Sequence, residues 1–303
     1  MNSVHSYAGD FLDVQASPSD TTLILAASAE IQDGKPRQSV VLLSLVDPVC
    51  EVKSSILKTD GRVKSLLWES SETVIVSTNS AVHAYRVRES ASCTSMDVLE
   101  VPDCGVSVID PHHSFTVAVA SDKSLLLWDR RAKSASLTFK TSHFFPILSL
   151  DANPSIEHQF VTGGADGRVM FWDIRQPSGS VAIKAVEAHN HHVTCVKYNT
   201  LHDQLLLTSG TDCAVNLWRF PSISSSPNKP APLTENVSRT SAISKPVSPA
   251  SDGLIHQYNR HEDTVHKLCW SVGRSSWSFA SVSYDGLVMF NSVPTQEKYR
   301  IMV

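Results

Sequence analysis

The stretch "VTGGADGRVMFWDIRQP", residues 161–177, places the hydroxyl of Thr162, the carboxylate of Asp166 and the indole of Trp172 close together in sequence. His143 precedes Thr162 by 19 residues, so the three groups of a hydrolytic triad all occur in this part of the chain. The same groups also suit a structural network of buried, hydrogen-bonded side chains. The rest of the chain decides between these two interpretations.

The pattern recurs 46 residues later, in "LLTSGTDCAVNLWRFP", residues 206–221. There Thr208, Asp212 and Trp218 keep the same mutual spacing, and His189 again precedes the hydroxyl by 19 residues. A catalytic triad is needed once in a protein, whereas a structural device is needed in every repeat. The repetition therefore favours the structural interpretation, and we expect the chain not to be an enzyme.

Two further stretches carry the pattern in weaker form. In "VAVASDKSLLLWDRR", residues 117–131, Ala118 replaces the hydroxyl, and in "FASVSYDGLVMFNSVP", residues 279–294, Asn291 replaces the tryptophan. We expect the aspartate to accept a hydrogen bond from the histidine, the imidazole to meet the hydroxyl, and the tryptophan N–H to donate. The predicted members of this network are His143, Thr162, Asp166, Trp172, His189, Thr208, Asp212, Trp218, His261, Ser281, Asp285, Asp122 and Trp128.

The repeat length indicates the fold class. A WD40 blade contains about 40–45 residues in four antiparallel strands, and the repeats of this chain have apolar, strand-like runs separated by polar turns. We predict an all-β fold, a WD40 β-propeller that forms a single domain over residues 1–303. Six blades are readable, at residues 11–46, 63–87, 103–140, 143–186, 189–222 and 258–294.

An insertion separates the fifth and sixth predicted blades, because the aspartate spacing there grows from 46 to 73 residues. The added segment, at about residues 221–257, is rich in serine and proline, a composition that does not build a packed core. We predict a disordered surface loop. Ser226 and Ser248 each precede a proline, and two interpretations stay open: phosphorylation by proline-directed kinases, or a passive insertion.

Composition narrows the class of protein. Lys and Arg number 26 against 30 Asp and Glu, and the net charge of −4 argues against a nucleic-acid-binding surface spread over the whole protein. No stretch approaches the roughly 18 apolar residues of a transmembrane helix, and the N-terminus lacks the features of a secretory signal. The six cysteines lie far apart without a C-x-x-C pair, which predicts a cytoplasmic protein with reduced thiols.

The histidine-rich stretch "AHNHHV", residues 188–193, raises the question of a metal site. His189 is expected to belong to the blade network, and alternation along an extended segment sends His191 and His192 to opposite sides. We therefore predict no metal site and no cofactor.

The loops that precede the first strand of each blade are candidate partner-binding surfaces, because exposed aromatic side chains often anchor protein interfaces. For Phe144 and Phe145 the alternative interpretation is packing against the neighbouring blade. The candidate residues are Phe144, Phe145, His191, His192, Glu262 and Asp263.

Two blades end in Trp-Asp-x-Arg, as "WDRR" at residues 128–131 and "WDIR" at residues 172–175. Such endings resemble the motif by which some WD40 proteins dock as substrate receptors on cullin-RING ubiquitin ligases. In that alternative, Arg131 and Arg175 would make the contact with the ligase.

Longer stretches carry a family resemblance. "YNTLHDQLLLTSGTD" (residues 198–212), "YNRHEDTVHKLCWS" (258–271) and "AGDFLDVQASPSD" (8–20) resemble the EARP- and GARP-interacting WD-repeat protein family. The resemblance implies a non-enzymatic adaptor that binds multisubunit vesicle-tethering complexes in endosomal recycling and endosome-to-Golgi retrograde transport. It also implies peripheral association with the trans-Golgi network and endosomes through protein partners, without an integral membrane segment.

Closure of the propeller is the last expectation. The ending "KYRIMV", residues 298–303, follows the sixth predicted blade and suggests the start of a strand. The family that the chain resembles has an additional N-terminal segment, long enough for another blade. Two arrangements are open: a seventh blade that residues 1–303 lack, which we favour, or a six-bladed ring with a strained or gapped junction.

Overall fold

The computed structural model describes residues 10–16, 23–32, 35–46, 49–59, 62–87, 93–113, 116–132, 134–176, 181–225, 251–271 and 276–302. The chain divides into two compact units. The first contains Met1–Leu150 and Gln176–Ala182, and the second contains Asp151–Arg175 and Ile183–Val303. The expectation of a single domain over residues 1–303 stays a prediction.

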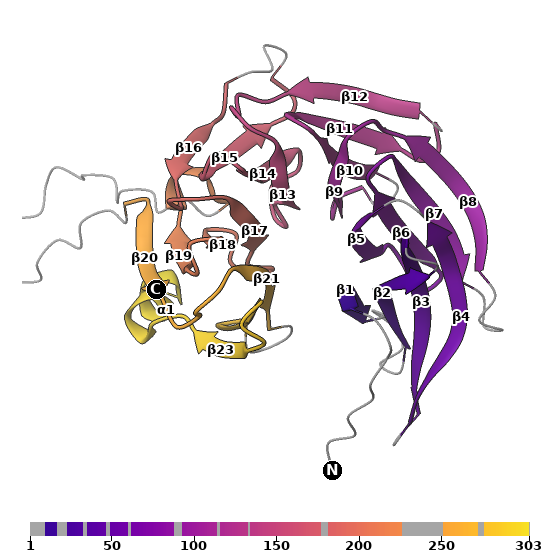
Figure 1. Cartoon of the computed structure of the whole chain (residues 1–303). Coiled ribbons are helices and arrows are strands. Elements are labelled where there is room, and N and C mark those ends of the chain that lie inside the picture. Colours follow the sequence, from indigo (N-terminus) through magenta and orange to yellow (C-terminus); the bar gives the residue numbers. More distant parts are fainter. Residues whose placement is uncertain are drawn as a thin grey trace, which may run out of the picture. The chain divides into compact units, whose positions relative to one another are not determined.

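The repeating element is a sheet of antiparallel strands that follow one another in sequence (Figure 1). Three such sheets come first: β1 (Asp10–Ala16), β2 (Leu23–Gln32), β3 (Lys35–Val46), β4 (Val49–Thr59); β5 (Val63–Trp68), β6 (Thr73–Thr78), β7 (Ala81–Val87), β8 (Cys93–Glu100); and β9 (Cys104–Ile109), β10 (Thr116–Ser121), β11 (Ser124–Asp129), β12 (Ser134–Lys140).

Three more sheets follow, of which the last has three strands among the described residues. They are β13 (Ile147–Ala152), β14 (Gln159–Gly164), β15 (Arg168–Asp173), β16 (Lys184–Glu187); β17 (Val193–Tyr198), β18 (Leu205–Gly210), β19 (Val215–Arg219), β20 (Gly253–Tyr258); and β21 (Val265–Trp270), β22 (Ser278–Ser283), β23 (Val288–Ser292). The described residues form five four-stranded blades, so the predicted count of six blades is not confirmed.

The central strands of the fifth sheet show why these runs are apolar on both faces. Every residue of β18 and β19 is buried. One face of the sheet, with Leu206 and Trp218, packs against the fourth sheet, while the other, with Leu207 and Leu217, packs against the sixth. Burial on both sides removes the alternation of polar and apolar residues that a half-exposed strand would show.

The turn between the second and third strands differs among the blades. In the fourth, Gly167 has a φ of +76°, and a Cβ there would lie 2.5 Å from the carbonyl oxygen of His189. In the third blade, Asp122 and Lys123 alone connect Ser121 to Ser124. The shorter turn changes the strand register, which affects the polar network described below.

The insertion lies elsewhere than predicted. It falls between the third and fourth strands of the fifth blade, not between two blades, because β20 pairs with β19. Both ends of the predicted loop are ordered, since Pro221–Ile223 form a 3-10 helix and Gly253 begins β20. Ser226 and Ser248 lie outside the described residues.

The C-terminal segment is a helix and not the predicted strand. Helix α1 spans Thr295–Met302, begins after Pro294, and carries Glu297 in its first turn and Arg300 in its last, where each charge suits the helix dipole. Ile301 packs against the core of the fifth and sixth sheets. In the part of the chain that the structure describes, no helix is long and apolar enough to cross a membrane.

Candidate functional site

The fifth blade contains a continuous chain of four polar side chains. The indole N–H of Trp218 donates to Thr208 Oγ1 at 3.0 Å, and that hydroxyl lies 2.8 Å from His189 Nε2. Nδ1 of His189 lies 2.9 Å from Asp212 Oδ1. If Nδ1 carries the proton, every contact joins one donor to one acceptor. This series of hydrogen bonds connects the loop before β17 to strands β18 and β19.

Gly210 makes room for this arrangement. A Cβ at that position would lie 2.7 Å from both Asp212 Oδ1 and His189 Nδ1. A side chain would therefore push the histidine and the aspartate apart. The glycine of "SGTD" is thus part of the sequence signal for the network.

The sixth blade repeats most of this hydrogen-bonded network. His261 Nδ1 lies 2.9 Å from Asp285 Oδ2, and His261 Nε2 lies 2.8 Å from Ser281 Oγ. Asn291 stands opposite Phe279, in the place that Trp218 takes opposite Leu206 in the fifth blade. The aspartate, histidine and hydroxyl thus remain together where the tryptophan is replaced.

In the fourth blade the indole N–H of Trp172 donates to Thr162 Oγ1 at 2.8 Å, and both residues are buried. Asp166 accepts the backbone N–H of Arg168 at 3.1 Å. His143 is buried in the first unit, whereas the other three residues belong to the second.

The third blade departs from the sequence-based interpretation. We predicted Ala118 in place of the hydroxyl, but the two-residue turn puts Val117 opposite Trp128 and Val119 opposite Leu126. Val119 therefore corresponds to Thr162 of the fourth blade. Thr162 stands opposite Met170, the residue two positions before Trp172, just as Val119 stands opposite Leu126. Among the described residues, Trp128 Nε1 is buried and has no hydrogen-bond partner.

Two of the network aspartates, Asp212 and Asp285, are held in their charged form. Burial raises the pKa of Asp212, but the hydrogen bond from His189 and the N–H groups of Asn190 and Ala214 outweigh it, so the pKa is lowered overall. The pKa of Asp285 is lowered in the same way, since backbone and histidine donors outweigh burial. Each carboxylate is therefore a hydrogen-bond acceptor at neutral pH.

The geometry has a chemical consequence. Thr162, Thr208 and Ser281 have no exposed surface. A nucleophilic hydroxyl must reach its substrate, and these three are shielded from solvent. The arrangement orders loops and strands and offers no accessible nucleophile at these positions.

The predicted partner-binding residues are exposed. Phe144 and Phe145 expose 63% and 58% of their surface in the first unit, so they do not fill the core. In the second unit the four candidates are exposed as well: His191, His192, Glu262 and Asp263. His192 Nδ1 lies 2.7 Å from the carbonyl oxygen of Ala165, which fixes its ring beside the turn after β14.

The Trp-Asp-x-Arg endings share one local geometry. The guanidinium of Arg131 contacts both oxygens of Asp129, at 3.2 and 3.3 Å, and that of Arg175 contacts both oxygens of Asp173, at 2.9 and 2.6 Å. Both arginines are exposed. The aspartate of each ending therefore holds its own arginine at the surface. The side-chain hydrogen bond from Arg175 lowers the pKa of Asp173.

Two buried arginines were missed by the sequence reasoning. Arg130 is buried in the first unit, where it pairs with Glu69 and lies 3.6 Å from Asp97. Arg219 is buried in the second unit and pairs with Glu297 of α1 at 2.6 Å. Arg219 follows Trp218, at a position where two other blades have aspartate. This departure from the repeat was the feature of the sequence that could have indicated a special role for Arg219.

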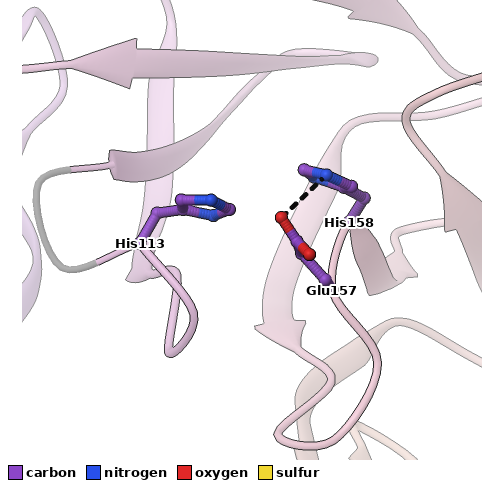
Figure 2. Close-up of side chains that lie close together, drawn as sticks. All are labelled: His113, Glu157 and His158. Carbon is purple, nitrogen blue, oxygen red and sulfur yellow. Dashed lines mark ion pairs between the residues drawn. The ribbon is translucent and has the colours of Figure 1, made fainter.

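Figure 2 shows the ion pair between His158 Nε2 and Glu157 Oε1, 3.0 Å apart in the second unit. His113, also drawn, belongs to the first unit, where its Nδ1 lies 3.2 Å from Asp110 Oδ2. Within either unit taken alone, the described residues contain no group of three metal-ligating side chains close together.

These features define the class of the protein: an all-β propeller of WD-type repeats with buried His-hydroxyl-Asp networks. The chain belongs to the EIPR1 β-propeller family, whose model matches residues 2–218. The predicted all-β propeller and the predicted family are confirmed, whereas the predicted count of six blades is not.

Relatives support the assignment. Human "EARP and GARP complex-interacting protein 1" is 35% identical over 263 residues, which are 85% of this chain and 63% of that protein. The rat protein of that name is 38% identical over 196 residues, 64% of this chain and 50% of the relative. "EARP-interacting protein 1" of Caenorhabditis elegans is 33% identical over 193 residues, 63% of this chain and 52% of the relative. The chain thus spans between half and two thirds of the length of these relatives.

Proposed function

We propose that the chain is a non-enzymatic adaptor that binds subunits of the EARP and GARP tethering complexes. The observation that carries the proposal is the family membership, with relatives whose names state an interaction with these complexes. The buried hydroxyls of the blade networks support the non-enzymatic part. In this proposal the protein acts in endosomal recycling and endosome-to-Golgi transport, in the cytoplasm and peripherally at the trans-Golgi network and endosomes.

Phe144 and Phe145 are the contact residues that we propose in the first unit. Exposed aromatic side chains are costly to leave in water and form frequent interface anchors. Their loop is fixed at both ends, because Thr141 Oγ1 donates to the Lys123 carbonyl at 2.6 Å and the Ile147 N–H donates to the Asp122 carbonyl at 2.8 Å. A rigid loop loses little entropy on binding. In the second unit we propose His191, His192, Glu262 and Asp263.

The test is direct binding of the purified chain to purified EARP and GARP complexes. We expect Phe144→Ser and Phe145→Ser together to weaken binding about 30-fold or more, the effect of removing one interface hot spot. Leu201→Ser is the matched control, because Leu201 is as exposed as the phenylalanines but is not a proposed contact. Failure of the wild-type chain to bind either complex would overturn the proposed function.

A second candidate function is favoured by the Trp-Asp-x-Arg geometry. We propose as the alternative that Arg131 and Arg175 dock the propeller on a cullin-RING ligase as a substrate receptor. The identical aspartate–arginine pairing in both blades supports it, because an arginine held in position is prepared for a bidentate contact. Affinity purification and mass spectrometry discriminate between the two functions. Recovery of cullin without tethering subunits, lost in Arg131→Ala and Arg175→Ala, would support the alternative.

A further inference from the structure

A buried arginine joins the second and third blades, in a group of side chains that we call the Arg130 cluster and define as Arg130, Glu69, Asp97 and Met96. Arg130 follows β11 of the third blade, whereas its three neighbours come from the second blade, and all four belong to the first unit. Nη1 of the guanidinium pairs with Glu69. Nη2 lies 3.6 Å from Asp97 Oδ2 and donates to the sulfur of Met96 at 3.9 Å. A thioether is a weak acceptor, so the contact with sulfur is the weakest of the three.

A β-bulge in β8 aims Met96 at the guanidinium. Ala84 pairs with Asp97 and Tyr85 pairs with Ser95, so Met96 is the extra residue between the two pairs. Consecutive residues of a regular strand point to opposite faces, yet Met96 and Asp97 both contact the same nitrogen, Nη2. A bulge makes this possible because it re-aims one side chain of the strand. The backbone of β8 therefore determines where the sulfur lies.

The guanidinium of Arg130 has more donors than its neighbours can accept. An arginine carries five N–H groups. Among the described residues, Arg130 Nε is buried without a hydrogen-bond partner, and Glu69 Oε1 is as well, so the ion pair uses one oxygen of the glutamate. Asp97, at 3.6 Å from Nη2, lies beyond hydrogen-bond distance. A stronger acceptor at the position of the sulfur would therefore satisfy a donor that the thioether satisfies poorly.

Met96 is open to solvent although its partner is not. The methionine exposes 38% of its surface, whereas Arg130 exposes 6%. Of the other described methionines, Met170 is buried, Met289 is half-buried and Met302 is exposed. A dissolved oxidant therefore reaches Met96 and Met302 most easily. Of these two described residues, Met96 is the one whose sulfur accepts a hydrogen bond from a guanidinium.

We propose that Met96 is a reversible oxidation site and that Arg130 binds the oxygen of its sulfoxide. The oxidant is hydrogen peroxide, which transfers one oxygen atom to Sδ. The O–O bond breaks as the S–O bond forms, the sulfur gives up two electrons, and the peroxide is reduced to water. The new oxygen points into the 3.9 Å interval between Sδ and Nη2, so a charge-assisted N–H···O bond replaces the N–H···S contact. Methionine sulfoxide reductases restore the thioether.

Oxidation at this position has an unusual consequence for stability. A sulfoxide normally destabilises a protein, because it turns an apolar side chain into a polar one. In the Arg130 cluster the sulfoxide instead gains a hydrogen bond to a charged donor, which is roughly twice as strong as a neutral one. The new bond joins β8, the outer strand of the second blade, to the residue that follows β11 in the third. Oxidation of Met96 therefore strengthens the connection between these two blades, whether or not the protein is an adaptor.

The first experiment treats the full chain carrying Met302→Leu with hydrogen peroxide and then with dithiothreitol, which reduces oxidised thiols but not sulfoxides. Peptide mass spectrometry identifies the oxidised methionines. We expect the sulfoxide at Met96 before Met170, and a melting midpoint raised by about 2–4 °C. The same treatment of Met96→Leu in this background should not raise the midpoint, and repair with both sulfoxide reductases, one for each epimer, should reverse the rise. Resistance of Met96 to peroxide, a midpoint that falls or stays unchanged, or failure of the repair would overturn the proposal.

The second experiment tests the role of Arg130 without an oxidant and without changing the arginine. Met96→Gln places an amide oxygen near the position of the sulfoxide oxygen, whereas Met96→Leu offers no acceptor. We expect the glutamine variant to melt about 2–4 °C above the leucine variant. Val98 supplies the matched control, because it is an exposed apolar residue of the same strand, and Val98→Gln should not melt above Val98→Leu. An equal difference at both positions, or none at Met96, would show that Arg130 does not bind the added oxygen.

Discussion

Replacement of Thr208 by valine is the most direct test of the polar network. Valine keeps the branched shape of threonine and removes the hydroxyl, which has no exposed surface and lies between His189 Nε2 at 2.8 Å and Trp218 Nε1 at 3.0 Å. The change leaves both nitrogens buried next to a methyl group. Neither gains access to water without movement of the surrounding strands, because β18 and β19 are buried along their whole length.

The expected cost follows from these two lost contacts. A buried polar group left without a partner costs about 1–3 kcal/mol. Because two groups are affected and such effects are not fully additive, we expect the free energy of unfolding to fall by about 2–4 kcal/mol. For a domain of this size each kcal/mol shifts the melting temperature by about 2–4 °C, so the midpoint should fall by roughly 4–16 °C.

Thr208→Ser is the matched control, because it keeps the hydroxyl and removes the methyl group. The loss of one buried methyl costs about 1 kcal/mol, so this variant should be the more stable of the two. Thermal and denaturant unfolding of both variants and the wild type measure the difference. If the valine variant is as stable as the serine variant or more so, the hydroxyl does not hold the network together.

Three more predictions concern single side chains. Val119→Thr should give the buried indole of Trp128 an acceptor and raise stability by about 1 kcal/mol, whereas Val117→Thr on the same strand should lower it, as thermal unfolding would show. Because folding lowers the pKa of Asp212, the ionised carboxylate stabilises the folded state above about pH 4, and this stabilisation is lost on acidification. Asp212→Asn should therefore make the free energy of unfolding less dependent on pH in acid. Glu297→Ala should cost about 3–5 kcal/mol in denaturant unfolding, because it leaves the Arg219 guanidinium buried without its partner.

Much of the fold follows from one spacing. The repeated spacing of histidine, hydroxyl and tryptophan predicted where the blades lie in the sequence. In the structure, His189, Thr208, Asp212 and Trp218 form one hydrogen-bonded network. The spacing works as a signal because these residues must meet across neighbouring strands, and the strand register fixes their separation in sequence. The exposed state of Phe144 depends on loop conformation, and the sequence alone left two interpretations open.

Other features were hidden for physical reasons. The six-residue interval from Asp122 to Trp128 equals that of the other blades, so the sequence does not reveal that the turn has two residues and that the register shifts. The ending "KYRIMV" contains isoleucine and valine, which suggested a strand, but local propensity was overridden by tertiary contacts. Glu297 pairs with buried Arg219, and these contacts stabilise a helix of only eight residues.

The third and sixth blades show that losing different members of the network has different consequences. In the sixth, the replacement of tryptophan by Asn291 removes the indole donor, while His261 keeps both Asp285 and Ser281 as partners. In the third, the register puts Val119 where a hydroxyl would stand, and the indole of Trp128 stays buried without an acceptor. Because an orphaned buried donor costs more than the loss of a complete pair, the third blade carries a penalty that the sixth avoids. A change that restores an acceptor should therefore stabilise the third blade more than any added donor could stabilise the sixth.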